Sequence, residues 1–244
     1  MRVIVPAGGF AKRLQYLGVH MAKPLVKVCD KPIIDYVMEK VINLNPSEII
    51  ITVNKKFEKD FRDWLSSRNY SNSWLHVEGS TREEEKLGTV LSLAMLLEKI
   101  PEDEYLIIAG DNLFSLNLED FVNFFYVKKA PVIALYDVKN IELVKMYSCV
   151  RISEDNRVLE FVEKPANPSS TLISTAIYML PWKSLVRVKD YLSEGGNRDA
   201  PGYFISWLCK NEPVYGYAFQ GYWFDIGTPQ TYEEACRFME SLNK

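Results

Sequence analysis

The sequence predicts an α/β fold with a mixed, mainly parallel sheet, helices on both of its faces, and a β-rich second half. Over about residues 1–140, short β-branched runs alternate with amphipathic segments of helical period. From about residue 141 to 230, strand-like segments follow one another more closely. The chain has 244 residues and shows neither a linker-like stretch nor an internal repeat. We therefore expect a single domain over residues 1–244.

In the first half, expected strands and helices alternate in the βαβα order of a Rossmann-like sheet. The clearest helix is expected at 33–44, where apolar residues recur at helical spacing and Pro32 suits the first turn. The other expected helices are 57–65, 90–100 and 118–127, and the expected strands are 3–6, 49–53, 74–77, 105–109 and 132–136.

The second half begins with an expected hairpin, because strand-like segments flank the turn residues Glu154, Asp155 and Asn156. The chain ends in an amphipathic helix that places Tyr232, Ala235, Cys236, Met239 and Leu242 on one face. The remaining elements are expected as strands at 149–152, 158–162, 172–179, 214–219 and 222–224 and as helices at 183–192 and 202–210.

Composition excludes several classes of protein. The net charge is −3 and no basic patch stands out, so we expect no nucleic-acid partner. The four cysteines, at 29, 149, 209 and 236, match no zinc spacing and are expected to be reduced thiols. Apolar stretches fall short of the ~20 residues that span a bilayer. We therefore expect a soluble, cytoplasmic protein with no membrane contact.

A glycine pair follows the first expected strand. Gly8 and Gly9 would let backbone amides approach a phosphate chain closely, and Lys12 and Arg13 add positive charge at the same place. The segment is neither a Walker loop nor the G-x-G-x-x-G of dinucleotide-binding proteins. A tight strand-to-helix turn is the alternative interpretation.

A carboxylate follows a later apolar strand, at Gly110 and Asp111. Ligands of open α/β sheets gather at the carboxyl ends of the strands. Magnesium takes one or two carboxylates together with substrate phosphates, and Asp111 suits that chemistry. A simple turn after the strand is the other interpretation.

Five segments in order resemble the sugar nucleotidyltransferase superfamily, and most closely the glucose-1-phosphate thymidylyltransferases. The segments are G-G-F-A-K-R-L at 8–14 with K-P-L at 23–25, K-L-G-T at 86–89, G-D at 110–111, F-V-E-K-P at 161–165 with S-T-A at 174–176, and W-F-D-I-G-T-P at 223–229. The resemblance covers about residues 1–236. It implies that a nucleoside triphosphate and a sugar 1-phosphate react, with magnesium, to a nucleotide sugar and pyrophosphate.

The resemblance also implies roles for single residues on the nucleotide side. Arg13 would hold the departing pyrophosphate, Lys23 would face the α-phosphate, and Asp111 and Asp225 would hold Mg²⁺. Gly88 would lie against the nucleobase. Gly8 and Gly9 would contact the nucleotide.

On the sugar side, the resemblance places Glu163 at the sugar hydroxyls and Lys164 at the sugar phosphate, and it places Thr175 in the segment that closes the pocket. Without the family, the Glu-Lys pair would be a solvated strand end. The stretch at 197–202, N-R-D-A-P-G, occurs in some relatives, and the sequence assigns it no role. Relatives often form dimers or tetramers, which allows a homo-oligomer here.

Departures from the family affect the substrates more than the reaction. Ser148 and Ala176 stand where the family often has glycine, and both could narrow the sugar pocket. The usual base-contacting Gln before L-G-T is missing. Thymidylyl or uridylyl transfer to glucose 1-phosphate is the first expectation, and guanylyl transfer to a mannose-type phosphate is the second. A non-catalytic nucleotide-sugar sensor is a further alternative, and a nicotinamide-dependent oxidoreductase is the weakest.

Overall fold

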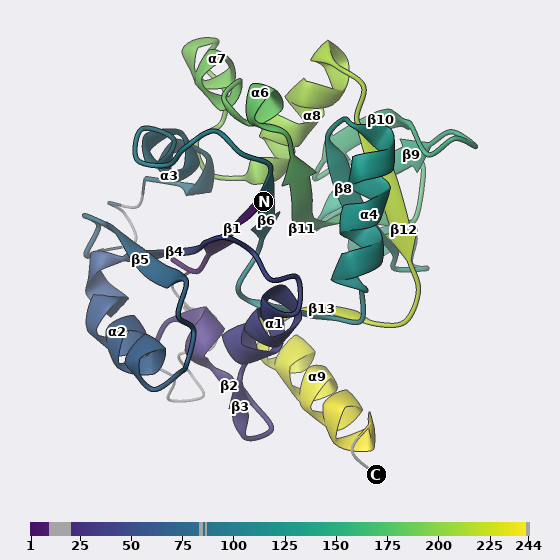
Figure 1. Ribbon diagram of the computed structural model, residues 1–244. Helices are drawn as coiled ribbons and strands as arrows, with labels where there is room; N and C mark the ends of the chain where they lie inside the picture. Colours follow the sequence, from purple (N-terminus) through teal and green to yellow (C-terminus); the bar gives the residue numbers. More distant parts are fainter. Residues whose placement is uncertain (10–20, 83–84, 86, 243–244) are drawn as a thin grey trace. The chain divides into compact units, whose positions relative to one another are not determined.

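The structure is a computed structural model that describes residues 1–9, 21–82, 85 and 87–242 (Figure 1). Its fold class is the predicted one, α/β with mixed strand directions. The chain divides into two compact units and passes between them several times. Unit 1 comprises Met1–Arg2, Leu87–Ile108 and Leu116–Gln220, and unit 2 comprises Val3–Lys86, Ala109–Ser115 and Gly221–Lys244.

Unit 2 contains three parallel strands in the order β1–β4–β5. Every residue of the central strand, β4, is buried, as its apolar run predicts for a parallel strand covered on both faces. Two antiparallel pairs, β2 with β3 and β7 with β13, complete its strands. The bounds are β1 Arg2–Pro6, β2 Lys27–Val28, β3 Lys31–Pro32, β4 Ile49–Asn54, β5 Ser73–Glu78, β7 Asn112–Phe114 and β13 Trp223–Asp225.

The described α-helices of unit 2 lie where the helical periodicity predicted them, whereas its two 3-10 helices were not predicted. The helices are the 3-10 helices η2 (Lys23–Leu25) and η3 (Lys55–Phe57) and the α-helices α1 (Ile33–Ile42), α2 (Glu58–Ser66) and α9 (Pro229–Leu242). In α9, Ala235 is fully buried in an apolar cluster against which Cys236 and Met239 also pack. Leu242, expected on the same face, is 55% exposed at the end of the helix. The Thr228 hydroxyl accepts from the Thr231 amide at 3.2 Å and caps α9.

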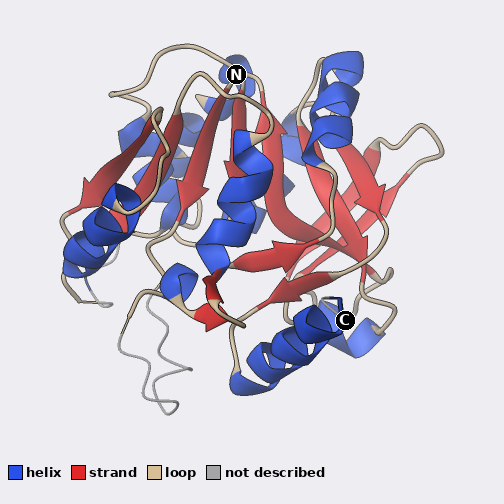
Figure 2. Ribbon diagram, turned by 60° about the horizontal axis from the view of Figure 1, so that its bottom comes forward, coloured by secondary structure: helices blue, strands red, loops and turns tan. Residues whose placement is uncertain are grey.

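Unit 1 contains four strands in the order β12–β8–β11–β6 and a separate antiparallel hairpin of β9 and β10. Figure 2 shows the helices of the protein in blue and its strands in red. Strand β12 is parallel to β8, whereas β11 is antiparallel to both of its neighbours. The strand bounds are β6 Tyr105–Ile108, β8 Val132–Asp137, β9 Ser148–Ile152, β10 Val158–Glu163, β11 Leu172–Leu180 and β12 Tyr215–Phe219. The helices are α3 Thr89–Leu96, α4 Leu118–Lys128, α5 Ile141–Val144, α6 Trp182–Leu185, α7 Val188–Ser193 and α8 Pro201–Asn211.

Some elements differ from the prediction. The helix expected at 183–192 is two helices, α6 and α7, with Arg187 between them. There the Arg187 guanidinium pairs with Glu212 at 3.0 Å and lies 4.8 Å from the ring of Trp207, so tertiary contacts outweigh local helix propensity. The short elements β2, β3, β7 and α5 were not predicted, because two to four residues carry too little periodicity.

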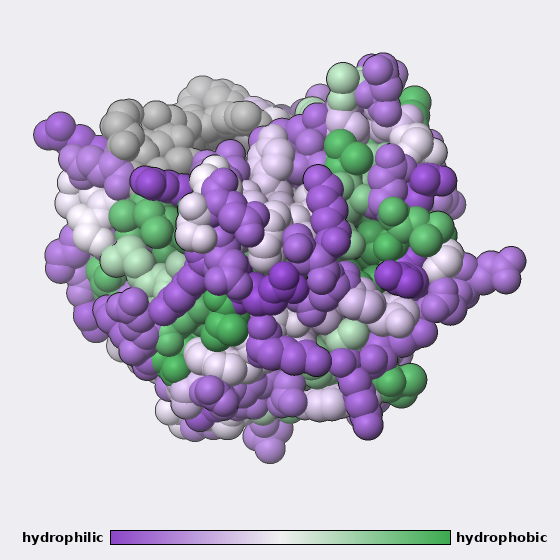
Figure 3. All heavy atoms as spheres, turned by 90° about the horizontal axis from the view of Figure 1, so that it is seen from above, coloured by the Kyte–Doolittle hydropathy of each residue, from purple (hydrophilic) through white to green (hydrophobic). Residues whose placement is uncertain are grey.

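No helix in the described part of the chain is long and apolar enough to cross a membrane. On the face drawn in Figure 3, apolar side chains form separate patches among polar ones. Several large apolar side chains are exposed, among them Val127 on α4, Leu159 on β10 and Met146 after α5. The expectation of a homo-oligomer stays a prediction.

Candidate active site

Two carboxylates of unit 2 converge on one ammonium group. Lys23 Nζ lies 2.8 Å from Asp111 Oδ2 and 2.6 Å from Asp225 Oδ1. The lysine side chain is 14% exposed, and the two aspartates are 27% and 35% exposed. The structure thus brings together three residues that the sequence selected from three separate motifs.

Strand pairing explains how the two aspartates meet. Asp225 ends β13, which pairs antiparallel with β7, and its Cα partner is Asn112, the residue after Asp111. Gly110 comes directly before Asp111, and its amide donates to the Pro6 carbonyl at 3.0 Å. A Cβ on Gly110 would lie 3.1 Å from Val5 Cγ1, so the Gly-Asp segment packs tightly on β1.

Two glycines line this cluster. A Cβ on Gly9 would lie 3.8 Å from Lys23 Cβ and 4.0 Å from Asp111 Oδ2. A Cβ on Gly227 would lie 3.7 Å from Asp225 Oδ1 and 3.9 Å from Lys23 Nζ. The Gly9 carbonyl also accepts from the Lys23 amide at 3.2 Å. The glycine backbone therefore reaches the charged groups closely, which is what a bound polyphosphate requires.

Gly8 is held by residues that sequence reasoning missed. The Asn54 side-chain amide donates to the Gly8 carbonyl, and Asn54 Oδ1 accepts from Ser80 Oγ at 2.7 Å. Asn54 and Ser80 are 2% and 5% exposed. The one signal in the sequence was a polar residue directly after the apolar run 49–53, because a buried amide at a strand end needs partners.

The electrostatics of the cluster favour a charged lysine. Burial alone would lower the pKa of Lys23, but attraction to Asp111 and Asp225 and their hydrogen bonds outweigh burial and raise that pKa above its ordinary value of 10.5. Two carboxylates and one ammonium leave the cluster with one net negative charge. A polyphosphate bound there therefore needs further positive charge.

The carboxylates of Asp111 and Asp225 are ligands of the kind that magnesium prefers. Two carboxylates already share one cation in this structure, and Mg²⁺ needs only one or two of them when substrate phosphates supply other oxygens. Within the described residues, no group of three or more His, Cys, Asp and Glu side chains could hold a metal ion. Two carboxylates are enough for a Mg²⁺ ion that also binds phosphate oxygens, so Asp111 and Asp225 fit such a shared metal. The predicted contributions of Lys12 and Arg13 lie outside the described residues.

In unit 1, Gly88 stands at the start of α3 with a positive φ of 87°. The amides of Val90 and Leu91 both donate to the Arg198 carbonyl, at 3.0 and 3.2 Å. A Cβ on Gly88 would lie 2.4 Å from the same oxygen, so only glycine fits. The sequence left open whether an anion binds this helix start, and these two amides are already engaged by the chain itself.

Glu163 ends β10, and Lys164 follows it directly. Glu163 is half-buried, and burial raises the pKa of its carboxyl although the Lys164 charge opposes this. Lys164 is exposed, has a φ of 49°, and donates its amide to the Tyr147 carbonyl at 2.6 Å. The carboxyl group of Glu163 lies against Gly202 of α8, where a Cβ would come within 2.0 Å of Oε2.

The neighbouring strand β11 contains an irregularity at the predicted sugar-pocket segment. Its register shifts between Ser174 and Tyr178, and Ala176 has a φ of 58°. The Thr175 hydroxyl is fully buried and donates to the Ala134 carbonyl at 3.1 Å. Ser148 Oγ accepts from the Ser174 amide at 2.9 Å. Both hydroxyls therefore hold the irregular backbone, and a role of Thr175 in sugar binding stays a prediction.

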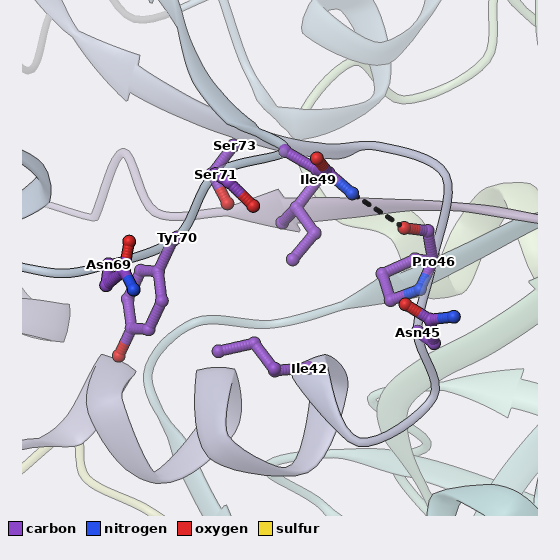
Figure 4. A pocket seen from close by; sticks show the side chains of 9 residues that line it. Ile42, Asn45, Pro46, Ile49, Asn69, Tyr70, Ser71 and Ser73 are labelled. Atoms are coloured by element: carbon purple, nitrogen blue, oxygen red, sulfur yellow. Dashed lines mark hydrogen bonds between the residues drawn. The ribbon is translucent and has the colours of Figure 1, made fainter.

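A hollow of about 110 Å³ in unit 2 lies away from the charged cluster (Figure 4). Ile49 and Ser73, which line it, begin β4 and β5, whereas Asn54 and Gly8 meet at the carboxyl end of β4. Its lining is uncharged and therefore unsuited to a triphosphate. The lining residues are Ile42, Asn45, Pro46, Ile49, Asn69, Tyr70, Ser71, Asn72 and Ser73.

The fold agrees with comparisons with known proteins. The chain belongs to the nucleotidyl transferase family, whose sequence profile matches residues 2–241. It is 30% identical over 240 residues to the bifunctional protein GlmU of Methanocaldococcus jannaschii, covering 98% of this chain and 54% of that protein. It is 28% identical over 250 residues to the glucose-1-phosphate adenylyltransferase of Thermosipho melanesiensis, covering 95% and 60%.

Among solved structures, a candidate glucose-1-phosphate thymidylyltransferase of Bacillus anthracis, crystallised with sucrose, shares the fold. The TM-score is 0.85 at 22% identity, and the match covers 98% of this chain and 94% of that one. The chain spans only 54% to 60% of the length of the two curated relatives. What those relatives bind therefore does not transfer directly to this protein.

Proposed function

We propose that the protein transfers a nucleotidyl group from a nucleoside triphosphate to a sugar 1-phosphate and releases pyrophosphate. The observation that carries this proposal is the position of Lys23 Nζ between Asp111 Oδ2 and Asp225 Oδ1, at 2.8 and 2.6 Å. Membership of the nucleotidyl transferase family supports the reaction class. A cluster with one ammonium and two carboxylates beside open glycine backbone suits a metal-neutralised polyphosphate.

Asp111 and Asp225 would hold Mg²⁺ in this proposal. When bound, the metal would neutralise negative charge on the phosphates and make the reacting phosphorus more electrophilic. The fit depends on the two carboxylates, which already face one cation, and on the glycine backbone at Gly9 and Gly227, which lies close to the charged groups.

The chain's own residues would bind and align the two anionic substrates. Backbone at Gly8 and Gly9 would contact the triphosphate, and the Lys23 ammonium would lie beside the α-phosphate. Lys164 would attract the sugar phosphate, and Glu163 would accept hydrogen bonds from sugar hydroxyls. Alignment and charge neutralisation together lower the barrier for phosphoryl transfer.

In the reaction, an oxygen of the sugar phosphate attacks the α-phosphorus, and the bond from that phosphorus to the β-bridging oxygen breaks. Pyrophosphate leaves with the electron pair, and the family resemblance assigns its stabilisation to Arg13, which lies outside the described residues. The attacking phosphate is already ionised at neutral pH, so no general base is required. This agrees with a chain that contains only two histidines, of which His76 is 8% exposed within β5.

For the substrates, we propose thymidylyl or uridylyl transfer to glucose 1-phosphate. The motifs at 8–14 and 223–229 support this choice by resemblance. The relatives differ in nucleobase, since one is an adenylyltransferase and a structural neighbour is a candidate thymidylyltransferase. The nucleobase is therefore a question for experiment.

A substrate grid tests the proposal. Pyrophosphate release is measured with Mg²⁺ for the five common nucleoside triphosphates against glucose, glucosamine, N-acetylglucosamine and mannose 1-phosphates. The Asp111→Asn, Asp225→Asn double variant serves as the blank. We expect one pair to give release well above the blank. Nucleotide binding without release for any pair would instead favour a sensor.

A further inference from the structure

The turn formed by residues 197–202 has no role in the chemistry described above, yet it contacts two of the predicted substrate-binding residues. Asn197 Oδ1 accepts from the amides of Asp199 and Ala200, at 2.8 and 3.1 Å. A side chain that accepts hydrogen bonds from the amides two and three residues further on holds the turn in its conformation. The turn leads directly into α8, which begins at Pro201.

One side of the turn determines the position of Gly88. The Arg198 carbonyl accepts from two amides in the first turn of α3, those of Val90 and Leu91. The turn also packs on the glycine itself, since a Cβ there would lie 2.4 Å from the Arg198 oxygen and 2.8 Å from Asp199 Cα. The backbone at Gly88 therefore keeps its place only while the turn keeps its conformation.

The other side of the turn determines the position of Glu163. Gly202 is the second residue of α8, and a Cβ on it would lie 2.0 Å from Glu163 Oε2 and 2.6 Å from Cδ. One turn further along the helix, Ser206 Oγ donates to the Phe161 carbonyl of β10 at 2.8 Å. The Glu163 carboxylate thus occupies the space that a side chain at position 202 would fill. It stands at the end of β10, to which α8 is hydrogen-bonded through Ser206.

We propose that the 197–202 turn is a positioning element that sets the affinities for both substrates together. This inference rests on the proposed function, in which Gly88 lies against the nucleobase and Glu163 binds sugar hydroxyls. One short segment then supports a residue of each subsite. A change that loosens the turn weakens the binding of the nucleotide and of the sugar phosphate at once.

The test compares Asn197→Ala with Asn197→Asp. In Asn197→Ala we expect KM to rise for both the nucleoside triphosphate and the sugar 1-phosphate by about tenfold, which corresponds to about 1.4 kcal/mol, while kcat changes less. Asn197→Asp retains an oxygen that accepts from both amides, so it should restore both KM values. Asn211→Ala, a matched change at the exposed far end of α8, should leave both values unchanged.

A second readout is independent of turnover. Hydrogen exchange at the amides of Val90 and Leu91 should be faster in Asn197→Ala than in the wild type and in Asn197→Asp. Unchanged KM values for both substrates in Asn197→Ala, or an equal rise in Asn211→Ala, would overturn the proposal. A wild type that turns over no substrate pair would refute the proposed function instead. Calorimetric affinities of these variants for a nucleoside triphosphate and a sugar 1-phosphate would then decide the positioning role.

Discussion

The predicted nucleotide side and the predicted sugar side of this protein are organised differently. In unit 2, Lys23, Asp111 and Asp225 hold one another by charge at 2.6 and 2.8 Å. In unit 1, the segment around Glu163 and Ala176 is shaped by backbone, with positive φ at Lys164 and Ala176 and a register shift in β11. In the proposed function, charge pairing would hold the groups that carry out the reaction, whereas the irregular backbone would determine which sugar fits.

The largest effect is expected from breaking the charged cluster. Asp111→Asn keeps the shape of the side chain but removes one of the two negative charges that would hold the metal. Loss of such a group costs on the order of 3 kcal/mol in the transition state, so turnover should fall about a hundredfold or more. Pyrophosphate release measures this, and Asp60→Asn, an exposed aspartate on α2 in the same unit, is the matched control. Near-normal turnover in Asp111→Asn would remove Asp111 from the metal site.

Replacing Lys23 tests whether the positive charge of the cluster is needed for turnover. Lys23→Met keeps most of the length of the side chain but leaves Asp111 and Asp225 facing each other without a cation. Turnover should fall by at least about tenfold, because the charge beside the α-phosphate is lost. Lys23→Arg keeps that charge and should retain more activity than Lys23→Met. Equal activities of the two variants would contradict a role for the charge.

The pKa shift of Lys23 also predicts how the stability of the protein depends on pH. A lysine whose pKa is raised on folding contributes stability that is fully present below its unfolded value. The contribution is lost as pH rises from the ordinary 10.5 through the folded value. The ion pairs should therefore stabilise the fold equally across neutral and mildly alkaline pH. Urea unfolding of the wild type and Lys23→Met at several such pH values checks this, and a difference that already shrinks there would contradict it.

On the sugar side, a smaller effect is expected at Ala176. An alanine at a φ of 58° is strained by about 1 kcal/mol relative to glycine. Ala176→Gly should therefore raise the free energy of unfolding by up to about 1 kcal/mol, less the extra entropy of the unfolded chain. Ala218→Gly, at an exposed position of β12, should lower it instead. Urea unfolding shows whether each substitution raises or lowers the free energy of unfolding. A loss of stability in Ala176→Gly would show that the strain is absent.

The smallest effect concerns Glu163. Burial raises the pKa of this carboxyl in the folded protein, so folding takes up a proton between the ordinary value of 4.5 and the raised one. Stability should therefore fall as pH rises through that window and recover on acidification. Glu163→Gln removes this dependence. The test compares the unfolding midpoints of the wild type and Glu163→Gln just above pH 4.5 and at neutral pH. Midpoints that change equally with pH in the two proteins would contradict a raised pKa.

The sequence identified the three residues of the charged cluster, Lys23, Asp111 and Asp225. Each stands in a motif whose residue types the expected chemistry requires. The sequence did not reveal the pairing of β7 with β13 that joins the two aspartates, since three-residue strands have almost no periodicity. Asn54 and Ser80 were missed because their partners are a backbone carbonyl and each other. The Arg198 carbonyl was missed because a backbone oxygen has no signature in the side chains.

The measurement that tests the central claim most directly is a magnesium titration of pyrophosphate release at saturating substrates, in the wild type and in Asp225→Asn. The protein is first treated with a chelator. We expect the chelated wild type to be inactive and to recover with Mg²⁺, and we expect Asp225→Asn to need far more Mg²⁺ for a much lower maximal rate. Equal magnesium dependence and equal maximal rates in the two proteins would contradict the assignment of Asp225 and, with it, the proposed centre.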